Sequence, residues 1–257
     1  MKTIQMQRIL VACLVLGLCG GPLLAEDAES VKSEKALEIL KQADEASRAV
    51  TTVRFHAKAE PAGVIANFIG AVEGTALMNG WNPEIRRPLK FWAKAEAKAP
   101  GTGAEMDMTC GGDGETFFLV DHKTKKGYED MDPAVLGTGG QTLGALGLAQ
   151  FVHPEPFQRE LDATAIELLG KGEVMGEECW KIRVTYAPGS GNDSGADWCI
   201  STRDHLPRQQ IRKFAFPQGE GELAITLSSL EVDPKFESAL FKMDLPEGYE
   251  AVDDFAP

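Results

Sequence analysis

Histidine is scarce in this sequence of 257 residues, so candidates for acid–base chemistry are few. The four are His56, His122, His153 and His205. None belongs to an HExxH motif or another closely spaced metal pair. Cys110 and Asp113 precede His122 by a few residues, and a Cys–His nucleophile would require them to converge in space. Because GxSxG, Walker and GxGxxG motifs are absent, the sequence predicts no enzyme and no cofactor. A hydrolase whose catalytic groups are scattered along the chain is one alternative.

Acidic and thiol side chains offer two further candidates. Asp193 and Asp197 flank Ser-Gly-Ala and could ligate Ca²⁺, but the segment lacks the full spacing of a calcium-binding loop. We therefore expect a solvated turn there and no metal site. Cys110, Cys179 and Cys199 follow the first 25 residues. Two arrangements are compatible with this odd number. Either Cys179 and Cys199 form a disulfide, or all three cysteines are buried thiols.

Burial of an apolar ligand is the chemistry that the residue pattern favours. Apolar side chains alternate with polar ones in many segments, which places them on one face of a sheet. A curved, loosely covered face could hold an alkyl chain, at about 0.8 kcal/mol for each buried CH₂. The expected lining residues are Phe55, Phe91, Met106, Met108, Trp180, Ile182, Trp198, Ile200, Leu223 and Ile225. The alternative for each is ordinary core packing.

The spacing of apolar residues along the chain predicts the helices and strands that would position these side chains. Residues 30–50 repeat apolar positions at helical spacing, with Ser30 or Ser33 as the cap. About ten strand-like segments follow, joined by short connections, which predicts an antiparallel sheet. Pro133 to Leu148 and Pro154 to Leu169 are expected to be helical, the first of them Gly-rich and suited to a lid.

Residues 1–25 have the layout of a cleaved secretory signal. Lys2 and Arg8 precede the apolar run Ile9 to Leu18, which is too short to span a bilayer. The alternative is lipid anchoring through Cys13 or Cys19. We therefore expect an exported, most simply periplasmic, single domain over residues 26–257, with no transmembrane segment.

The charge of the predicted mature chain excludes one class of partner. The precursor has a net charge of −13, and removal of Lys2 and Arg8 leaves −15. Such an acidic chain would release no counterions from phosphates, so we expect no nucleic-acid partner.

Three local motifs carry a resemblance to a known family. The first is Gly112 to Phe118, and the second is Asp197 to Arg208, which ends in Leu-Pro-Arg. The third is Val232 to Tyr249, which begins with Val-Asp-Pro and ends in Leu-Pro-Glu-Gly-Tyr. In this order, behind a leading helix, they resemble the LolA-like (outer-membrane lipoprotein carrier) superfamily, especially its uncharacterised periplasmic proteins. The resemblance implies an α+β, mainly antiparallel open half-barrel of ten to eleven strands, with the N-terminal helix and the central helical insertion as lid.

The same resemblance implies a binding module, and possible carrier, for a lipid or lipoprotein acyl chain. Another reading is a structural or interaction protein of the cell envelope with a filled core. That protein would meet another envelope protein near Trp92 or the Gly-rich segment 137–147. The hydrolase reading would instead require His122 or His153 to meet a carboxylate or Cys110.

Overall fold

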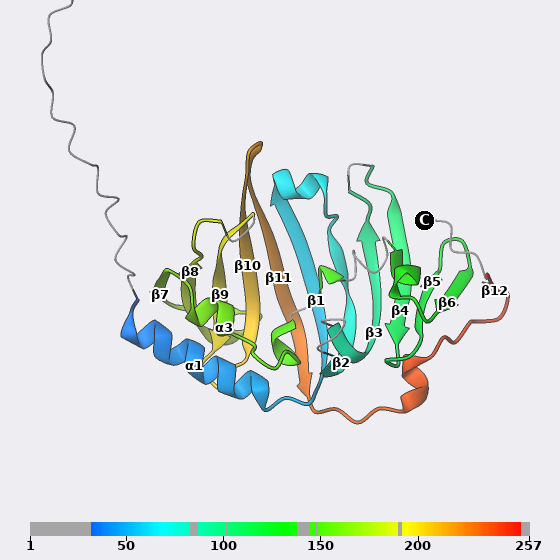
Figure 1. The fold of residues 1–257 in the computed structure, drawn as a ribbon, viewed down its shortest axis with the longest axis horizontal. Helices are drawn as coiled ribbons and strands as arrows, with labels where there is room; N and C mark the ends of the chain where they lie inside the picture. Colours follow the sequence, from blue (N-terminus) through cyan, green and yellow to red (C-terminus); the bar gives the residue numbers. More distant parts are fainter. Residues whose placement is uncertain are drawn as a thin grey trace, which may run out of the picture.

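The fold is built around one large sheet. The computed structural model describes residues 32–82, 87–100, 102–137, 144–146, 149–189 and 192–252, so the predicted signal lies outside the described residues. Within them, twelve strands form a single open sheet in the order β12-β6-β5-β4-β3-β2-β1-β11-β10-β9-β8-β7 (Figure 1). Neighbours are antiparallel except β12 and β6, which pair in parallel.

The strands are as follows: β1 Thr52–Gly63, β2 Val72–Asn82, β3 Arg87–Lys98, β4 Glu105–Gly112, β5 Phe117–Asp121, β6 Lys126–Asp130, β7 Ala165–Val174, β8 Glu177–Thr185, β9 Asp193–Ser201, β10 Pro207–Phe216, β11 Gly219–Val232 and β12 Glu250–Ala251. The described helices are α1 Glu34–Arg48 and α3 Gln158–Leu161, with the 3₁₀ turns η1 Val64–Asn67, η2 Pro133–Leu136, η3 Ala149–Phe151 and η4 Ser238–Phe241. The first and last strands of the order, β12 and β7, leave the sheet open.

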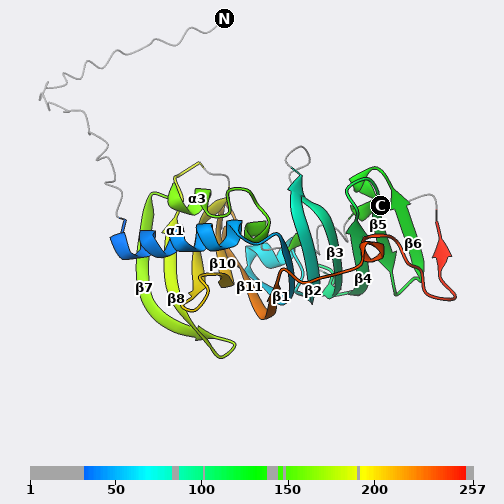
Figure 2. The same cartoon turned by 90° about the horizontal axis from the view of Figure 1, so that it is seen from below.

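The leading helix forms as its sequence predicts. The Ser33 hydroxyl caps α1 by accepting from the Ala36 amide, Glu34 occupies the first turn and Arg48 the last. The buried stripe consists of Ala36, Ile39, Leu40 and Ala43. This apolar stripe joins the main core, and α1 lies across β7 to β11 (Figure 2). The helix therefore covers one half of the sheet.

Strand register defines the sheet face that packs against α1, here called the inner face. Phe55 on β1 stands opposite Ala76 on β2, and Ala76 opposite Ala93 on β3. On the other side of β1, Ala59 stands opposite Ile225 on β11, beyond a bulge at His56 and Ala57. These positions are all buried in one cluster, so the period-two alternation in the sequence places its apolar members on the inner face.

The strand count and the central insertion differ from expectation. The sequence predicted ten to eleven strands, whereas the described chain has twelve. The prediction of a helix from Pro154 to Leu169 was wrong, because only α3 is helical and β7 begins at Ala165. Ile166, Leu168 and Leu169 have an ambiguous period, and pairing with β8 decides in favour of the strand. Of the predicted helix 133–148, the described part holds η2, while residues 138–143, 147 and 148 lie outside the described residues.

A second apolar layer covers the opposite, outer face of β2 to β5. Leu77, Trp92 and Phe118 follow one another across these strands, alternating with the inner-face positions. The chain after β11 returns along the sheet to β12, and η4 packs on β3 (Figure 1). A Cβ atom added at Gly127 would meet Leu245, so this returning segment lies directly on β6. Trp92 thus belongs to an internally covered face, and no partner-contact role is needed to explain it.

Candidate functional site

All ten residues that the sequence singled out project from the inner face. Register pairs Phe91 with Gly112 and Ala95 with Met108 on β3 and β4. On the other half of the sheet it pairs Ile182 with Trp198. Seven of the ten are buried in the main cluster, and three are partly buried against it. The buried seven are Phe55, Met108, Ile182, Trp198, Ile200, Leu223 and Ile225; the other three are Phe91, Met106 and Trp180.

Part of this face is filled by the chain itself. The Phe151 ring lies 5.8 Å from that of Phe55, and the Phe157 ring lies 5.0 Å from that of Trp198, between ring centroids. Phe151 and Phe157 come from the segment that contains η3 and leads into α3. Phe55 and Trp198 therefore serve as core in this structure, as the alternative for each residue anticipated.

The inner face of β1 to β3 is lined by small side chains. Ala57, Gly74 and Ala95 form one row across these strands, and it ends at Met108 on β4. A second row holds Ala76 and Ala93. The alanines of these rows are at most 6% exposed, and the rows share their buried cluster with Val135, Leu136 and Leu146. In the described chain β5 and β6 meet the four-residue η2, and α1 makes no comparable packing there.

Sequence reasoning did not find a polar pocket of about 480 Å³ that adjoins this apolar face. Gln210 and Arg212 on β10 line the pocket, and the register places them beside Trp198 and Ala196 on the inner face. Its full lining is Gln150, His153, Glu155, Pro156, Gln158, Arg159, Glu160, Asp162, Tyr186, Gln210 and Arg212. The pocket is thus a polar region set into the apolar face.

Two arginines of this pocket share one carboxylate. Arg159 Nη1 donates to Asp193 Oδ2 at 2.7 Å, and Arg212 Nη2 donates to the same oxygen at 2.9 Å. The Arg159 guanidinium also lies over the Tyr186 ring, 3.9 Å from its centroid. Two positive charges therefore share one negative charge at the centre of this group.

A buried carboxyl lies beneath them. Glu160 is 3% exposed and accepts a 3.0 Å hydrogen bond from the Tyr186 hydroxyl. Burial raises the pKa of Glu160, although the hydrogen bonds and Arg159 act in the opposite direction. Burial also raises the pKa of Tyr186, so the phenol keeps the proton that it donates.

The calcium candidate is occupied by side chains of opposite charge. Asp193 is held by Arg159 and Arg212, as described above. Asp197 is held by Arg183 and Lys213, each at 2.8 Å, and register places it on the outer face. Among the described residues, no group of three or more His, Cys, Asp or Glu side chains could hold a metal ion.

Among the described contacts, Cys110 and His122 do not form the nucleophilic pair that one form of the hydrolase hypothesis proposed. Cys110 points to the inner face, where burial raises the pKa of its thiol to about 12. His122 instead contacts Thr109 and Tyr249, at 2.8 and 3.0 Å. His153 packs edge-on against Trp81. Cys110, Cys179 and Cys199 are free thiols here, and Cys179 and Cys199 share a small apolar cluster.

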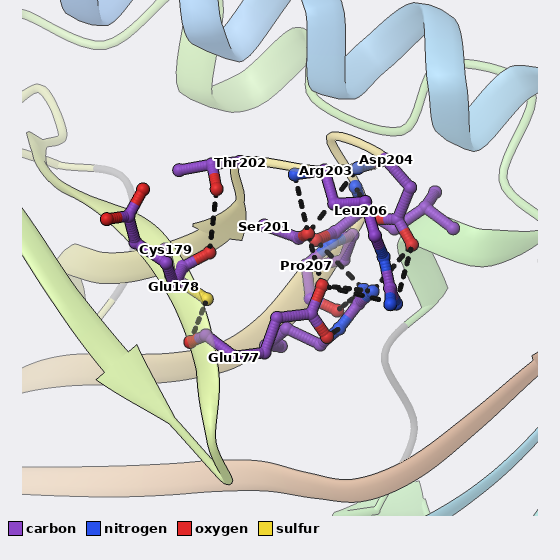
Figure 3. A network of polar contacts seen from close by, with 10 residues as sticks. Glu177, Glu178, Cys179, Ser201, Thr202, Arg203, Asp204, Leu206 and Pro207 are labelled. Atoms are coloured by element: carbon purple, nitrogen blue, oxygen red, sulfur yellow. Dashed lines mark hydrogen bonds and ion pairs between the residues drawn. The ribbon is translucent and has the colours of Figure 1, made fainter.

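Among described residues, the densest polar network joins the β9–β10 turn to the start of β8 (Figure 3). Arg208 donates from Nε to Glu177 at 2.8 Å and from Nη2 to Asp204 at 2.6 Å. Ser201 also donates to Glu177. Burial favours a higher pKa for both carboxyls, but the hydrogen bonds and charge of Arg208 lower the pKa of each. This network fixes the turn between β9 and β10.

Comparisons with known proteins bear on the fold. No protein-family model and no curated protein matches the sequence. Among solved structures, LprF from Mycobacterium bovis is similar, with 14% identity over 85% of this chain and 99% of that one, at a TM-score of 0.50. Lipoprotein LppX from Mycobacterium tuberculosis matches with 14% identity over 79% and 99% of the chains at 0.46. A LolA superfamily protein from Nitrosomonas europaea matches with 10% identity over 81% and 97% at 0.34.

These likenesses concern architecture. The fold of this chain is similar to that of LprF. This agrees with the architecture that the resemblance of its sequence motifs implied. Identities of this size leave ligand and partner to be argued from the site itself. Among the residues that the structure describes, none of the helices has the length and apolarity needed to cross a bilayer.

Proposed function

We propose that this chain is an exported, periplasmic binding module for an apolar ligand, a lipid or a lipoprotein acyl chain, which it could carry within the cell envelope. The observation that carries the proposal is the asymmetry of the inner face. Its β7–β11 half packs against α1, whereas its β1–β3 part presents rows of alanine and glycine beside the partly buried Phe91 and Met106.

The physics of this arrangement favours an alkyl chain. Small side chains create space on a sheet, and Met106 and Met108 have flexible thioethers that adapt to variable occupants. A chain of a dozen carbons would gain on the order of 10 kcal/mol from burial, before the costs of association are subtracted. Of the other expected lining residues, Trp180 is partly buried and would extend this apolar surface. The rest are packed in the core: Phe55, Ile182, Trp198, Ile200, Leu223 and Ile225.

Native mass spectrometry of the chain purified gently from the cell envelope tests this function. We expect a co-purified apolar species, or uptake of added palmitate at one equivalent. Ala95→Leu fills the row at β3 and should abolish the adduct, because Ala95 is buried on the inner face. Ala224→Leu adds the same atoms on the outer face of β11 and should leave the adduct intact.

The melting temperature of both variants establishes that they are folded under the conditions of the measurement. A wild-type chain that neither carries nor takes up an apolar molecule would contradict the proposal and favour the filled-core envelope protein. Loss of the adduct in both variants would place the ligand elsewhere on the molecule and would contradict the inner face of β1 to β3 as its position.

A further inference from the structure

The polar pocket beside the apolar face contains hydrogen-bonding capacity that the protein does not use. Gln210 is 6% exposed, lines the pocket, and forms no side-chain hydrogen bond with another residue of the described chain. Its amide atoms are not among the fully buried atoms that lack a partner, so they open into the pocket and stay available for hydrogen bonding. A side chain that faces the pocket in this state is arranged to meet a ligand or ordered water.

The arginines add further donors in the same place. A guanidinium has five N–H groups. Within the described chain, Arg212 hydrogen-bonds only through Nη2, and Arg159 only through Nη1, both to Asp193. Asp193 neutralises one of the two positive charges and leaves the pair a set of free donors, in a pocket that also holds the carboxyls of Glu155, Glu160 and Asp162.

The surroundings restrict what can bind. Register sets Gln210 between Ile225 and Trp198, and Arg212 between Leu223 and Ala196, all on the inner face. The acidic lining residues Glu155, Glu160 and Asp162 lie in the segment around α3, so a negative group is favoured on the β10 side. A ligand that fits both surfaces has a compact anionic end and an apolar remainder.

We propose that this pocket binds the singly charged oxygen head of an amphiphile, a carboxylate or a phosphate ester, over Arg212 and Gln210 while its alkyl chain lies on the adjoining apolar face. This inference rests on the proposed function and specifies the class of ligand. Charge-assisted hydrogen bonds from a guanidinium to a carboxylate or phosphate provide the recognition, and the apolar face provides the remaining affinity.

Calorimetric titration of the folded chain with palmitate and with hexadecanol, which has the same chain and no charge, tests the pocket. We expect palmitate to bind about tenfold more tightly than hexadecanol, the effect of one charge-assisted bond. Arg212→Gln should reduce this preference to about one, and Gln210→Leu should reduce it in the same direction. Arg183→Gln, which breaks a comparable ion pair on the outer face, should preserve the preference.

The outcomes separate this inference from the proposed function. Equal affinity of the wild type for palmitate and hexadecanol would overturn the headgroup pocket and leave apolar binding standing. Absence of binding by both would overturn both proposals. Acetate or inorganic phosphate that displaces palmitate at equal concentration would reveal a site for a free small anion and would overturn the amphiphile. A preference lost equally in Arg183→Gln would show that overall charge, and not the pocket, selects the ligand.

Discussion

At the scale of single residues, charge pairs distinguish structural from ligand-binding arginines. The side chain of Arg208 is 7% exposed and is saturated by Glu177 and Asp204. Arg212 is 38% exposed, holds one carboxylate and faces a pocket. A buried, saturated arginine contributes to the fold, whereas a partly exposed arginine with spare donors can meet a ligand.

Arg208→Gln should therefore destabilise the chain by roughly 2–3 kcal/mol at neutral pH, because two partly buried carboxylates lose their buried partner and keep only the exposed Arg203 as a cation. Arg183→Gln removes a more exposed pair and should cost less than about 1 kcal/mol. Urea denaturation monitored by tryptophan fluorescence measures both.

The effect should depend on pH in one direction. The pKa values of Glu177 and Asp204 are lowered by folding, so their stabilisation is full above the ordinary values of 4.5 and 3.8. It disappears as the pH falls through the lower folded values. The gap between wild type and Arg208→Gln should shrink in acid, and a gap that stayed constant down to pH ~3 would refute this role for the network.

The site was predictable from the sequence only in part. Apolar alternation placed all ten candidate residues on one face, because side-chain direction in a strand follows from the period alone. The polar pocket could not be found in this way. Arg159, Asp193 and Arg212 come from separate elements, and only sheet order and the path of the segment around α3 bring them together.

At the scale of elements, the sequence predicted helices and strands correctly where the spacing of apolar residues was regular. The helix α1 has a regular apolar stripe and a capping serine, and it forms as predicted. The strand β7 was misread because its pairing with β8, not its own sequence, determines its state. The two-residue β12 carries too little pattern to be recognised, and its place depends on the returning C-terminal segment.

That returning segment should contribute strongly to stability. Phe241 in η4 is 1% exposed and packs edge-on against Phe236, with ring centroids 5.2 Å apart. Phe241→Ala should cost about 3–5 kcal/mol, because it opens a cavity in the outer layer. Phe68→Ala, at a site that is 64% exposed, should change stability by less than about 1 kcal/mol.

Chemical denaturation of the two variants provides the comparison. Similar midpoints for Phe241→Ala and Phe68→Ala would contradict a second core on the outer face. A large loss in Phe241→Ala alone would explain how a twelve-stranded sheet avoids leaving both faces of its β2–β5 part open to solvent.

At the scale of the whole molecule, the two faces of the sheet, and the two halves of its inner face, are covered by different segments of the chain. The C-terminal segment covers the outer face of β3 and β6, and α1 covers the inner face of the β7–β11 half. The inner face of β1 to β4 carries the rows of small side chains beside the partly buried Phe91 and Met106. Under the proposed function, an apolar ligand would bind here while the other half of the sheet keeps a stable core.

Photolabelling tests this claim most directly. Palmitate that carries a diazirine near its terminal methyl group is bound to the folded chain and activated, and labelled residues are located by tandem mass spectrometry. The account predicts labels at alternate positions of β3 and β4, on Phe91, Ala93, Ala95, Met106 or Met108, and not on Trp92 or Lys94. Labels on consecutive residues, or on the outer-face positions Trp92 and Lys94, would contradict it.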